Sequence, residues 1–216
     1  MLKSEEFVEL VTEKFPQISR DAAKKVADFY FLVIEANAQQ NLTRIIDPDE
    51  FIERNLSDAL AVINSGELAY PALDLGSGFG VPGLLCAILS PGEWILSESE
   101  SLKADFLMIA TKKLGLDAQI RVFSGRAEDF LAKNRVGCIV SRAVGSIDKI
   151  MSWVGKCSTW NKMILLKGPR WDQEWDGLRL NLKKQLVIKK MSKYSNKYSD
   201  NLALIILDRV PRGTRQ

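Results

Sequence analysis

Residues 73–83 read LDLGSGFGVPG, a short apolar run that ends on an acid and continues into a loop containing four glycines. Glycine lets the backbone approach a ligand closely, because it has no side chain and tolerates positive φ. A segment with helical spacing follows the loop. An apolar strand, a glycine-rich turn and a helix in this order predict a site for a nucleotide-type cofactor.

The glycine spacing alone is compatible with two kinds of cofactor. Residues 78–83 match the G-x-G-x-x-G dinucleotide pattern, and Glu98 ends the next apolar run about twenty residues later, where a carboxylate binds ribose hydroxyls. Asp74 precedes the first glycine by two residues. Its charge would repel a pyrophosphate but favour the cationic centres of S-adenosylmethionine. We therefore favour a methyltransferase over a dinucleotide enzyme, and both over a purely structural turn in which Asp74 neutralises a helix dipole.

The composition limits the classes of protein that fit. At 216 residues the chain can form one α/β domain, residues 67–216, preceded by a helical cap, residues 1–66. It has no apolar stretch of membrane-spanning length and no basic, apolar leader, which predicts a soluble, cytoplasmic protein without a membrane partner.

The three cysteines are widely spaced in apolar surroundings, so we expect buried free thiols. Because histidine is absent, we expect no His-dependent triad and no metal site. We also expect a monomer.

The formal charge of +3 is unevenly distributed along the chain. Residues 167–216 contain twelve Lys/Arg and five Asp/Glu, a net of +7, so residues 1–166 carry a net of −4. This asymmetry makes the C-terminal quarter a candidate surface for a polyanion such as nucleic acid. A solvated basic face is the alternative.

The first third of the chain shows apolar residues at helical spacing. The predicted helices cover residues 4–15, 19–40 and 48–64. Ser4 and Ser19 are the expected N-caps of the first two helices, and Pro16 separates them. Pro48 lies in the first turn of the third helix. These helices form the predicted cap.

From residue 70 onward, short apolar runs alternate with amphipathic segments. The predicted strands cover residues 72–75, 93–97, 118–123, 137–141 and 162–166, and the predicted helices cover 81–89, 102–114, 127–131, 147–155 and 171–180. This alternation implies parallel strands with right-handed crossovers in an open, doubly wound sheet. Ligands bind at the carboxyl ends of such strands, where Asp74, Glu98 and Arg142 lie.

The chain finishes with two candidate strands, residues 185–191 and 202–207, and nothing of helical length separates them. They predict an antiparallel hairpin that closes one edge of the sheet. A mostly parallel seven-stranded sheet with such a C-terminal hairpin is typical of the Rossmann-like class I methyltransferase fold.

The sequence also restricts the methyl acceptor. Methylation of exocyclic amines on nucleobases typically uses an Asp/Asn-Pro-Pro-aromatic loop after the fourth strand. Residues 141–144 read SRAV at this place, so that class is disfavoured. Methylation of pyrimidine C5 needs a cysteine nucleophile, which usually follows a proline, and the chain contains no Pro-Cys pair. A ring nitrogen with a free lone pair, such as guanine N7, needs neither a base nor a covalent helper, so positioning can supply most of the acceleration. A donor on N7 would occupy the attacking lone pair, so we expect Arg142 to contact O6 or a phosphate.

Six short motifs occur in the order found in a known family. They are NLT at 41–43, the glycine loop at 74–83, ES at 98–99 with Lys103 and FL at 106–107, RAE at 126–128, SRA at 141–143, and KG at 167–168. With these motifs the chain resembles RsmG, also called GidB, a family of bacterial small-subunit ribosomal RNA methyltransferases, over roughly residues 30 to 170. It departs from the family at Asn55, where a His is common, and at Leu102, where a second basic residue is usual.

The resemblance implies S-adenosyl-L-methionine-dependent methylation of N7 of one guanine in 16S rRNA, with the small ribosomal subunit as partner. Together with the motif analysis it gives a set of candidate cofactor-binding residues: Asp74, Gly76, Ser77, Gly78, Phe79, Glu98, Ala127, Glu128 and Arg142. Arg142 and Lys167 are the candidate catalytic residues, and Asn41, Thr43 and Arg126 are candidates for substrate binding. Two other functions stay open, a small-molecule S-adenosylmethionine-dependent methyltransferase and a non-catalytic ribosome-binding protein.

Overall fold

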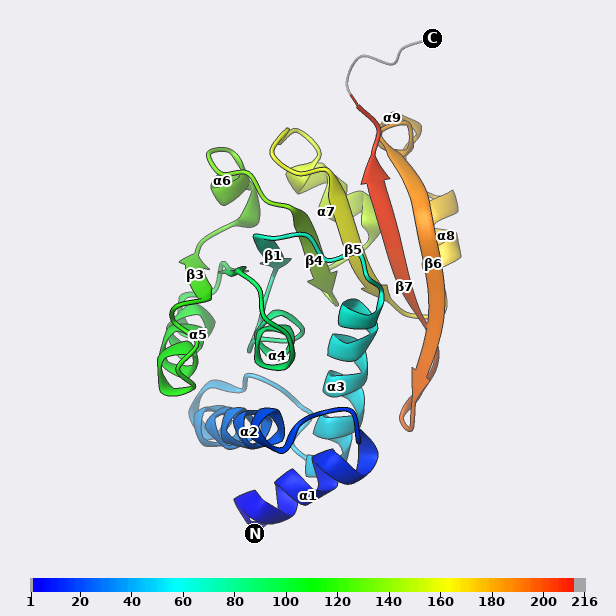
Figure 1. The fold of residues 1–216 in the computed structure, drawn as a ribbon. Helices are drawn as coiled ribbons and strands as arrows, with labels where there is room; N and C mark the ends of the chain where they lie inside the picture. Colours follow the sequence, from blue (N-terminus) through cyan, green and yellow to red (C-terminus); the bar gives the residue numbers. More distant parts are fainter. Residues whose placement is uncertain (1, 212–216) are drawn as a thin grey trace.

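Three helices precede the sheet in the computed structural model, which describes residues 2–211 (Figure 1). They are α1 (Ser4–Lys14), α2 (Arg20–Gln40) and α3 (Pro48–Asn64). Ser19 is the N-cap of α2, as predicted, and its hydroxyl accepts the backbone N–H of Ala22. The prediction for Ser4 is wrong, because α1 begins at Ser4 and the N-cap position is Lys3, whose backbone N–H is satisfied by the Glu6 carboxylate.

Within the described residues the sheet has seven strands in the order β3-β2-β1-β4-β5-β7-β6. β7 pairs antiparallel with both of its neighbours, β5 and β6, and the other pairs are parallel. The strands are β1 (Ala72–Leu75), β2 (Trp94–Glu98), β3 (Ile120–Ser124), β4 (Cys138–Arg142), β5 (Lys162–Lys167), β6 (Leu186–Asn196) and β7 (Ser199–Arg209). The later helices are α4 (Gly83–Leu89), α5 (Ser101–Lys113), α6 (Ala127–Leu131), α7 (Ile147–Val154), α8 (Trp171–Asp176) and α9 (Leu180–Lys183). The predicted fold is thus confirmed.

Two segments differ from their predicted form. The helix predicted over residues 171–180 is divided into α8 and α9 at Gly177, which is the C-cap of α8. The hairpin strands are longer than predicted, 11 residues each, with only Lys197 and Tyr198 between them. The polar sequence of residues 192–201 hides this pairing, because ladder hydrogen bonds come from the backbone and do not need apolar side chains.

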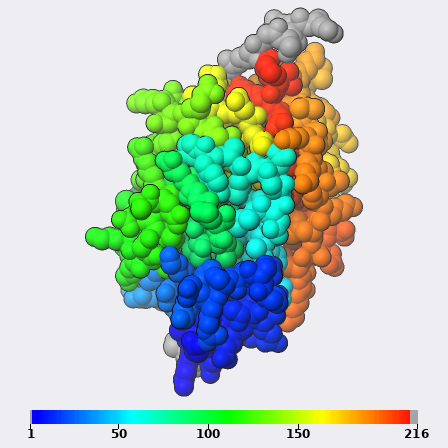
Figure 2. Space-filling view, viewed as in Figure 1, coloured from blue at the N-terminus to red at the C-terminus, as the bar shows by residue number. Residues whose placement is uncertain are grey.

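Buried apolar residues form one cluster on each face of the sheet. The helices α1 to α5 cover one face, where Trp94, Val140 and Ile206 are buried. The helices α6 to α9 cover the other, where Leu73, Ile139 and Met163 are buried. The N-terminal helices therefore share their core with the sheet, and the boundary at residue 66 stays a prediction. Figure 2 shows α3 beside the C-terminal hairpin on the first of these faces.

None of the helices found within residues 2–211 is long and apolar enough to cross a membrane.

Candidate functional site

The loop after β1 has a backbone that only glycine accommodates easily. Gly76, Gly78 and Gly80 have φ values of 70°, 57° and 112°. A Cβ built on Gly76 would lie 2.6 Å from Cγ2 of Val144, so the loop runs directly against the segment that follows β4. The N–H groups of Gly76 and Ser77 donate to the carbonyl oxygen of Ser97 at 3.0 and 3.1 Å. These contacts fix the loop across the ends of β1, β2 and β4.

Glu98 ends β2 beside this loop. Its Oε2 accepts the backbone N–H of Gly78 at 2.9 Å, and its Oε1 accepts the backbone N–H of Glu100 at 2.8 Å. The side chain is mostly buried, so its carboxylate is held in one orientation at the strand end. The structure therefore brings the predicted ribose acceptor and the glycine loop together.

A cavity of about 90 Å³ lies on one side of the loop, and we call it the loop-side cavity. It is lined by Leu75, Gly76, Ser97, Ser99, Gly125, Arg126, Ala127, Glu128, Val144 and Trp153. Gly76, Ala127 and Glu128, all predicted cofactor residues, lie here together. Arg126, predicted on the substrate side, lines this same cavity, because it immediately precedes α6 at the end of β3.

Trp153 was not among the candidate residues. It lies on α7 and lines the loop-side cavity, and the Lys149 ammonium is 5.3 Å from the centre of its ring. No motif marks Trp153 in the sequence. Only the packing of α7 against the strand ends brings the ring to the cavity.

Asp74 is fully buried beneath the loop. Its Oδ2 accepts the backbone N–H of Gly83 at 2.9 Å, at the beginning of α4. Burial raises the pKa of this carboxyl group to about 7, and the Gly83 hydrogen bond opposes that shift. Its other oxygen has no hydrogen-bond partner among residues 2–211. This is the helix-terminus role that the sequence left as the alternative, and a contact between Asp74 and a cofactor stays a prediction.

The side chains of Ser77 and Phe79 turn inward. The Ser77 hydroxyl donates to the carbonyl oxygen of Asp74 at 3.0 Å. The Phe79 ring packs near Phe29 and Phe51, with ring centres 6.4 and 6.3 Å away. Neither side chain lines the loop-side cavity, and a contact of Ser77 or Phe79 with a cofactor stays a prediction. Both residues instead attach the loop to the strand and the N-terminal helices.

A second cavity, of about 210 Å³, lies between α3, the ends of β4 and β5, and the C-terminal hairpin. We call it the hairpin-side cavity. Its lining residues are Arg54, Asp58, Arg142, Ala143, Leu166, Lys167, Gly168, Tyr194, Asn196, Ser199 and Leu202. The two predicted catalytic residues, Arg142 and Lys167, thus lie in one cavity. The contributions from α3 and the hairpin were not predicted.

Arg142 is held by two side chains of α3. Its Nη1 donates to Oδ1 of Asn55 at 2.8 Å, and its Nε forms an ion pair with Oδ2 of Asp58 at 3.0 Å. The Tyr194 hydroxyl donates to the other Asp58 oxygen at 2.5 Å. Burial raises the pKa of Asp58, whereas Arg142 and Tyr194 oppose that shift. Asn55, the residue in place of the family's usual His, therefore contacts the predicted catalytic arginine.

Lys167 is held from the opposite side of the same cavity. Its ammonium donates to the carbonyl oxygen of Gly145 at 2.5 Å and to Oε2 of Glu174 at 2.8 Å. The same Glu174 oxygen accepts the backbone N–H of Ile147 at 3.1 Å. These contacts tie β5 to α7 and α8 and fix the position of the ammonium.

Asn41 and Thr43 have local roles in the structure. Asn41 ends α2 with a φ of 50°. The N–H of Thr43 donates to Oδ1 of Asn37 at 2.8 Å, and the Thr43 hydroxyl accepts the N–H of Ile45 at 3.1 Å. Neither residue lines either cavity. These contacts fit the capping role that is the alternative to substrate binding.

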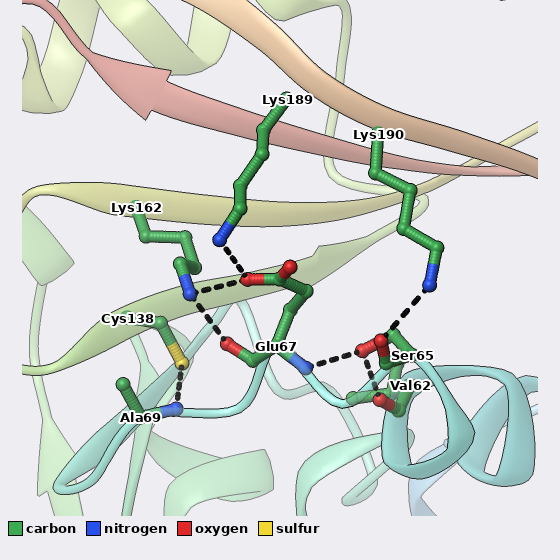
Figure 3. A network of polar contacts seen from close by, with 8 residues as sticks. All are labelled: Val62, Ser65, Glu67, Ala69, Cys138, Lys162, Lys189 and Lys190. Atoms are coloured by element: carbon green, nitrogen blue, oxygen red, sulfur yellow. Dashed lines mark hydrogen bonds and ion pairs between the residues drawn. The ribbon is translucent and has the colours of Figure 1, made fainter.

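Several basic residues of the C-terminal quarter have intramolecular partners. Figure 3 shows Glu67 accepting hydrogen bonds from Lys162 and Lys189, while Lys190 donates to the carbonyl oxygen of Ser65. Other pairs are Lys197 with Asp49, Arg179 with Asp148 and Lys183 with Asp176. Arg212 and Arg215, counted in the predicted basic surface, lie outside the described residues. The excess of positive charge is thus partly compensated by acids elsewhere in the chain.

The three cysteines are free, as predicted. Cys86 and Cys138 are buried, as predicted, whereas Cys157 is only half-buried. The part of the chain that the structure describes contains no group of three or more Cys, Asp or Glu side chains arranged to hold a metal ion.

The strand order, the glycine loop and the acidic end of β2 define a Rossmann-like class I methyltransferase fold. The crystal structure of an O-methyltransferase from Bacillus cereus, solved in complex with S-adenosylhomocysteine, superposes with a TM-score of 0.56 at 14% sequence identity, covering 84% of this chain and 90% of that chain. At this level of identity the likeness concerns the fold.

The sequence comparison identifies the family. Residues 22–203 match GidB, described as rRNA small subunit methyltransferase G, and the chain belongs to this family. A ribosomal RNA small subunit methyltransferase G from Rhodopirellula baltica is 39% identical over 140 residues, which cover 64% of this chain and 60% of the relative. A protein of the same name from Mesoplasma florum is 32% identical over 182 residues, which cover 82% of this chain and 76% of the relative. The match thus spans less than two thirds of the first relative's length.

Proposed function

We propose that this protein transfers a methyl group from S-adenosyl-L-methionine to N7 of a guanine in 16S rRNA of the small ribosomal subunit. One observation carries the proposal. Two cavities lie at the carboxyl ends of the strands, the first bounded by the glycine loop and the second containing Arg142 and Lys167. This is where open α/β sheets bind their ligands. Membership of the rRNA methyltransferase family supports the choice of substrate.

The proposed cofactor site is the glycine loop with the strand ends beside the loop-side cavity. Glu98 does not line this cavity itself but lies between two residues that do, Ser97 and Ser99. A Cβ built on Gly78 would meet no atom within 4 Å, so the loop is open beside the Glu98 carboxylate that accepts the Gly78 N–H. Glu98 is proposed to accept hydrogen bonds from the ribose hydroxyls, and Ala127 and Glu128 to lie beside the adenine. When bound, S-adenosylmethionine supplies a methyl group activated by its sulfonium centre. Gly78 and Glu98 would hold the cofactor in place through the loop they share.

The hairpin-side cavity is the proposed site of the base. Because guanine N7 has a free lone pair, the chain needs no general base, and Arg142 and Lys167 act by binding and orientation. We propose that Arg142 donates to O6 or to a phosphate, which leaves N7 open to the methyl group. The guanine would have to leave its stack to enter, as bases do in enzymes that modify them. Lys167, which is buried and paired with Gly145 and Glu174, would supply a second cation.

We further propose that the protein acts in the cytoplasm, as a monomer, on the small subunit or its RNA. Basic side chains near the hairpin-side cavity would hold the flanking phosphates. Binding should then weaken as salt rises, because each neutralised phosphate releases counterions.

The test is methyl transfer from labelled S-adenosylmethionine to naked 16S rRNA, to isolated small subunits and to a panel of small molecules, followed by mapping of the modified nucleotide. The expected result is label on one guanine, at N7. Label found only on small molecules would favour the small-molecule methyltransferase. Binding to subunits with no cofactor binding would favour the non-catalytic ribosome-binding protein.

A further inference from the structure

The C-terminal hairpin supplies part of the wall of the hairpin-side cavity. Tyr194 and Asn196 come from β6, and Ser199 and Leu202 from β7. In the predicted fold the hairpin only closes the edge of the sheet. In the structure it faces α3, as Figure 2 shows, and the two elements enclose the cavity together with the ends of β4 and β5.

Two Tyr–Asp hydrogen bonds join this hairpin to α3. Tyr194 donates to Asp58 at 2.5 Å, and Tyr198 donates to Asp49 at 2.7 Å. Both pairs have the same chemistry and join the same two elements. They differ in place, because Tyr194 and Asp58 line the hairpin-side cavity and the other pair does not.

Asp58 connects Tyr194 to the predicted catalytic arginine. One carboxylate oxygen accepts from Tyr194, and the other is 3.0 Å from Nε of Arg142. The guanidinium has five N–H donors in one plane. Asp58 and Asn55 engage two of its nitrogens. The plane of the guanidinium is thereby fixed, and the donors left over have a defined direction.

The burial of Asp58 makes its partners important. Its side chain is mostly buried, and Arg142, Arg54 and Tyr194 are the groups that favour its ionised form. Without the tyrosine hydroxyl, one oxygen of a buried carboxylate loses its donor, and such a group rotates, takes up a proton or admits water. Each of these responses would alter the ion pair with Arg142.

We propose that Tyr194 is a positioning residue, which holds Asp58 so that Asp58 aims the remaining Arg142 donors at the RNA base. The C-terminal hairpin is then part of the guanine site. This inference rests on the proposed function for its kinetic consequence. The orientation of Arg142 can also be measured without any reaction.

The experiment compares Tyr194→Phe with Tyr198→Phe. Each variant removes one hydroxyl that joins the hairpin to α3 and keeps the ring, so the second variant controls for a general loosening of the hairpin. Tyr194→Phe should lower kcat on small subunits by roughly 10- to 100-fold, the loss expected when a reacting group is misplaced. KM for the subunit and affinity for S-adenosylhomocysteine should stay within about twofold, because flanking RNA contacts and the loop-side cavity are unchanged. Tyr198→Phe should retain the kcat of the unaltered protein.

The second readout is the Nε–H signal of Arg142 in nitrogen-15 NMR, assigned from its loss in Arg142→Lys. A slowly exchanging, resolved signal is expected in the unaltered protein and in Tyr198→Phe, and a shifted or broadened one in Tyr194→Phe. The inference is overturned if Tyr194→Phe changes neither kcat nor the signal, or if both variants lose activity equally. If the unaltered protein methylates no RNA, the proposed function fails, and the Arg142 signal alone decides whether Tyr194 positions the arginine.

Discussion

The carboxylate of Glu98 accepts the backbone N–H of Gly78 at 2.9 Å, and this bond joins the end of β2 to the glycine loop. The two carboxylate oxygens accept one backbone donor each, from Gly78 and Glu100. An ionised carboxylate has about four acceptor positions, so capacity is left for the two hydroxyls of a ribose. Glu98 can thus shape the loop and bind a cofactor at the same time.

Glu98→Ala should weaken binding of S-adenosylhomocysteine by about 10- to 100-fold, since a hydrogen bond to a charged group contributes about 1.5–3 kcal/mol. Isothermal titration calorimetry measures this affinity directly. Glu100→Ala is the control, because Glu100 is an exposed neighbour whose carboxylate pairs with Lys103. Unchanged affinity in Glu98→Ala would count against the ribose role.

Arg142→Ala should reduce methyl transfer to the small subunit by about 100-fold or more, with affinity for S-adenosylhomocysteine retained, because the RNA loses the guanidinium that is proposed to donate to O6 or to a phosphate. Arg142→Lys is the companion variant, since it keeps a cation beside buried Asp58 but not the planar fork. Arg121→Ala, which removes an exposed arginine on β3, should leave transfer unchanged. Full activity in both Arg142 variants would remove this residue from the site.

Trp153 should report on binding to the loop-side cavity. Titration with S-adenosylhomocysteine should quench intrinsic fluorescence in the unaltered protein but much less in Trp153→Phe. The affinity of Trp153→Phe should fall by about two- to tenfold, since aromatic contacts contribute about 0.5–1.5 kcal/mol beyond area burial. Trp171→Phe, on α8, should keep the full quench. An equal quench in both variants would show that the ligand does not reach Trp153.

Asp74 should make stability depend on pH. Its pKa is raised by burial from the ordinary value of 3.8 to about 7, so between these values the native state binds a proton that the unfolded state has released. The free energy of unfolding should therefore fall as pH rises through this window, with a slope contribution of up to about 1.4 kcal/mol per pH unit.

The check is urea unfolding between pH 4 and pH 8 for the unaltered protein and for Asp74→Asn, which cannot titrate at that position. The difference in unfolding free energy between the two should change with pH in favour of the variant as pH rises. The part of this difference that does not change with pH says nothing about the pKa of Asp74, because the asparagine amide introduced by the substitution also needs a buried hydrogen-bond partner. Asp117→Asn, at an exposed position, should run parallel to the unaltered protein. A pH-independent difference for Asp74→Asn would contradict the raised pKa.

The sheet was predictable because apolar runs and glycines act locally. The bounds of two elements are predicted to the residue, β1 at 72–75 and α6 at 127–131. A buried parallel strand needs a continuous apolar run, and the residues that flank a short helix mark where it begins and ends. The grouping of Gly76, Ala127 and Glu128 at one cavity follows from the rule that the carboxyl ends of parallel strands lie together.

Directions of side chains were not predictable in the same way. Asp74 and Phe79 lie in the right stretch, but the loop folds over the strand and turns both side chains inward. Arg126 carries a charge that fits RNA, but its place before α6 puts it at the loop-side cavity. Tyr194 lies in a polar segment without apolar alternation, and its contact with Asp58 depends on the packing of the hairpin against α3.

Tyr194 and Asp58 are separated by 136 positions in the chain. During translation, the glycine loop and the first five strands are made well before the residues that complete the second cavity. The loop-side cavity is therefore built from residues up to 153, whereas the hairpin-side cavity has its full lining only once residue 202 has been added to the chain.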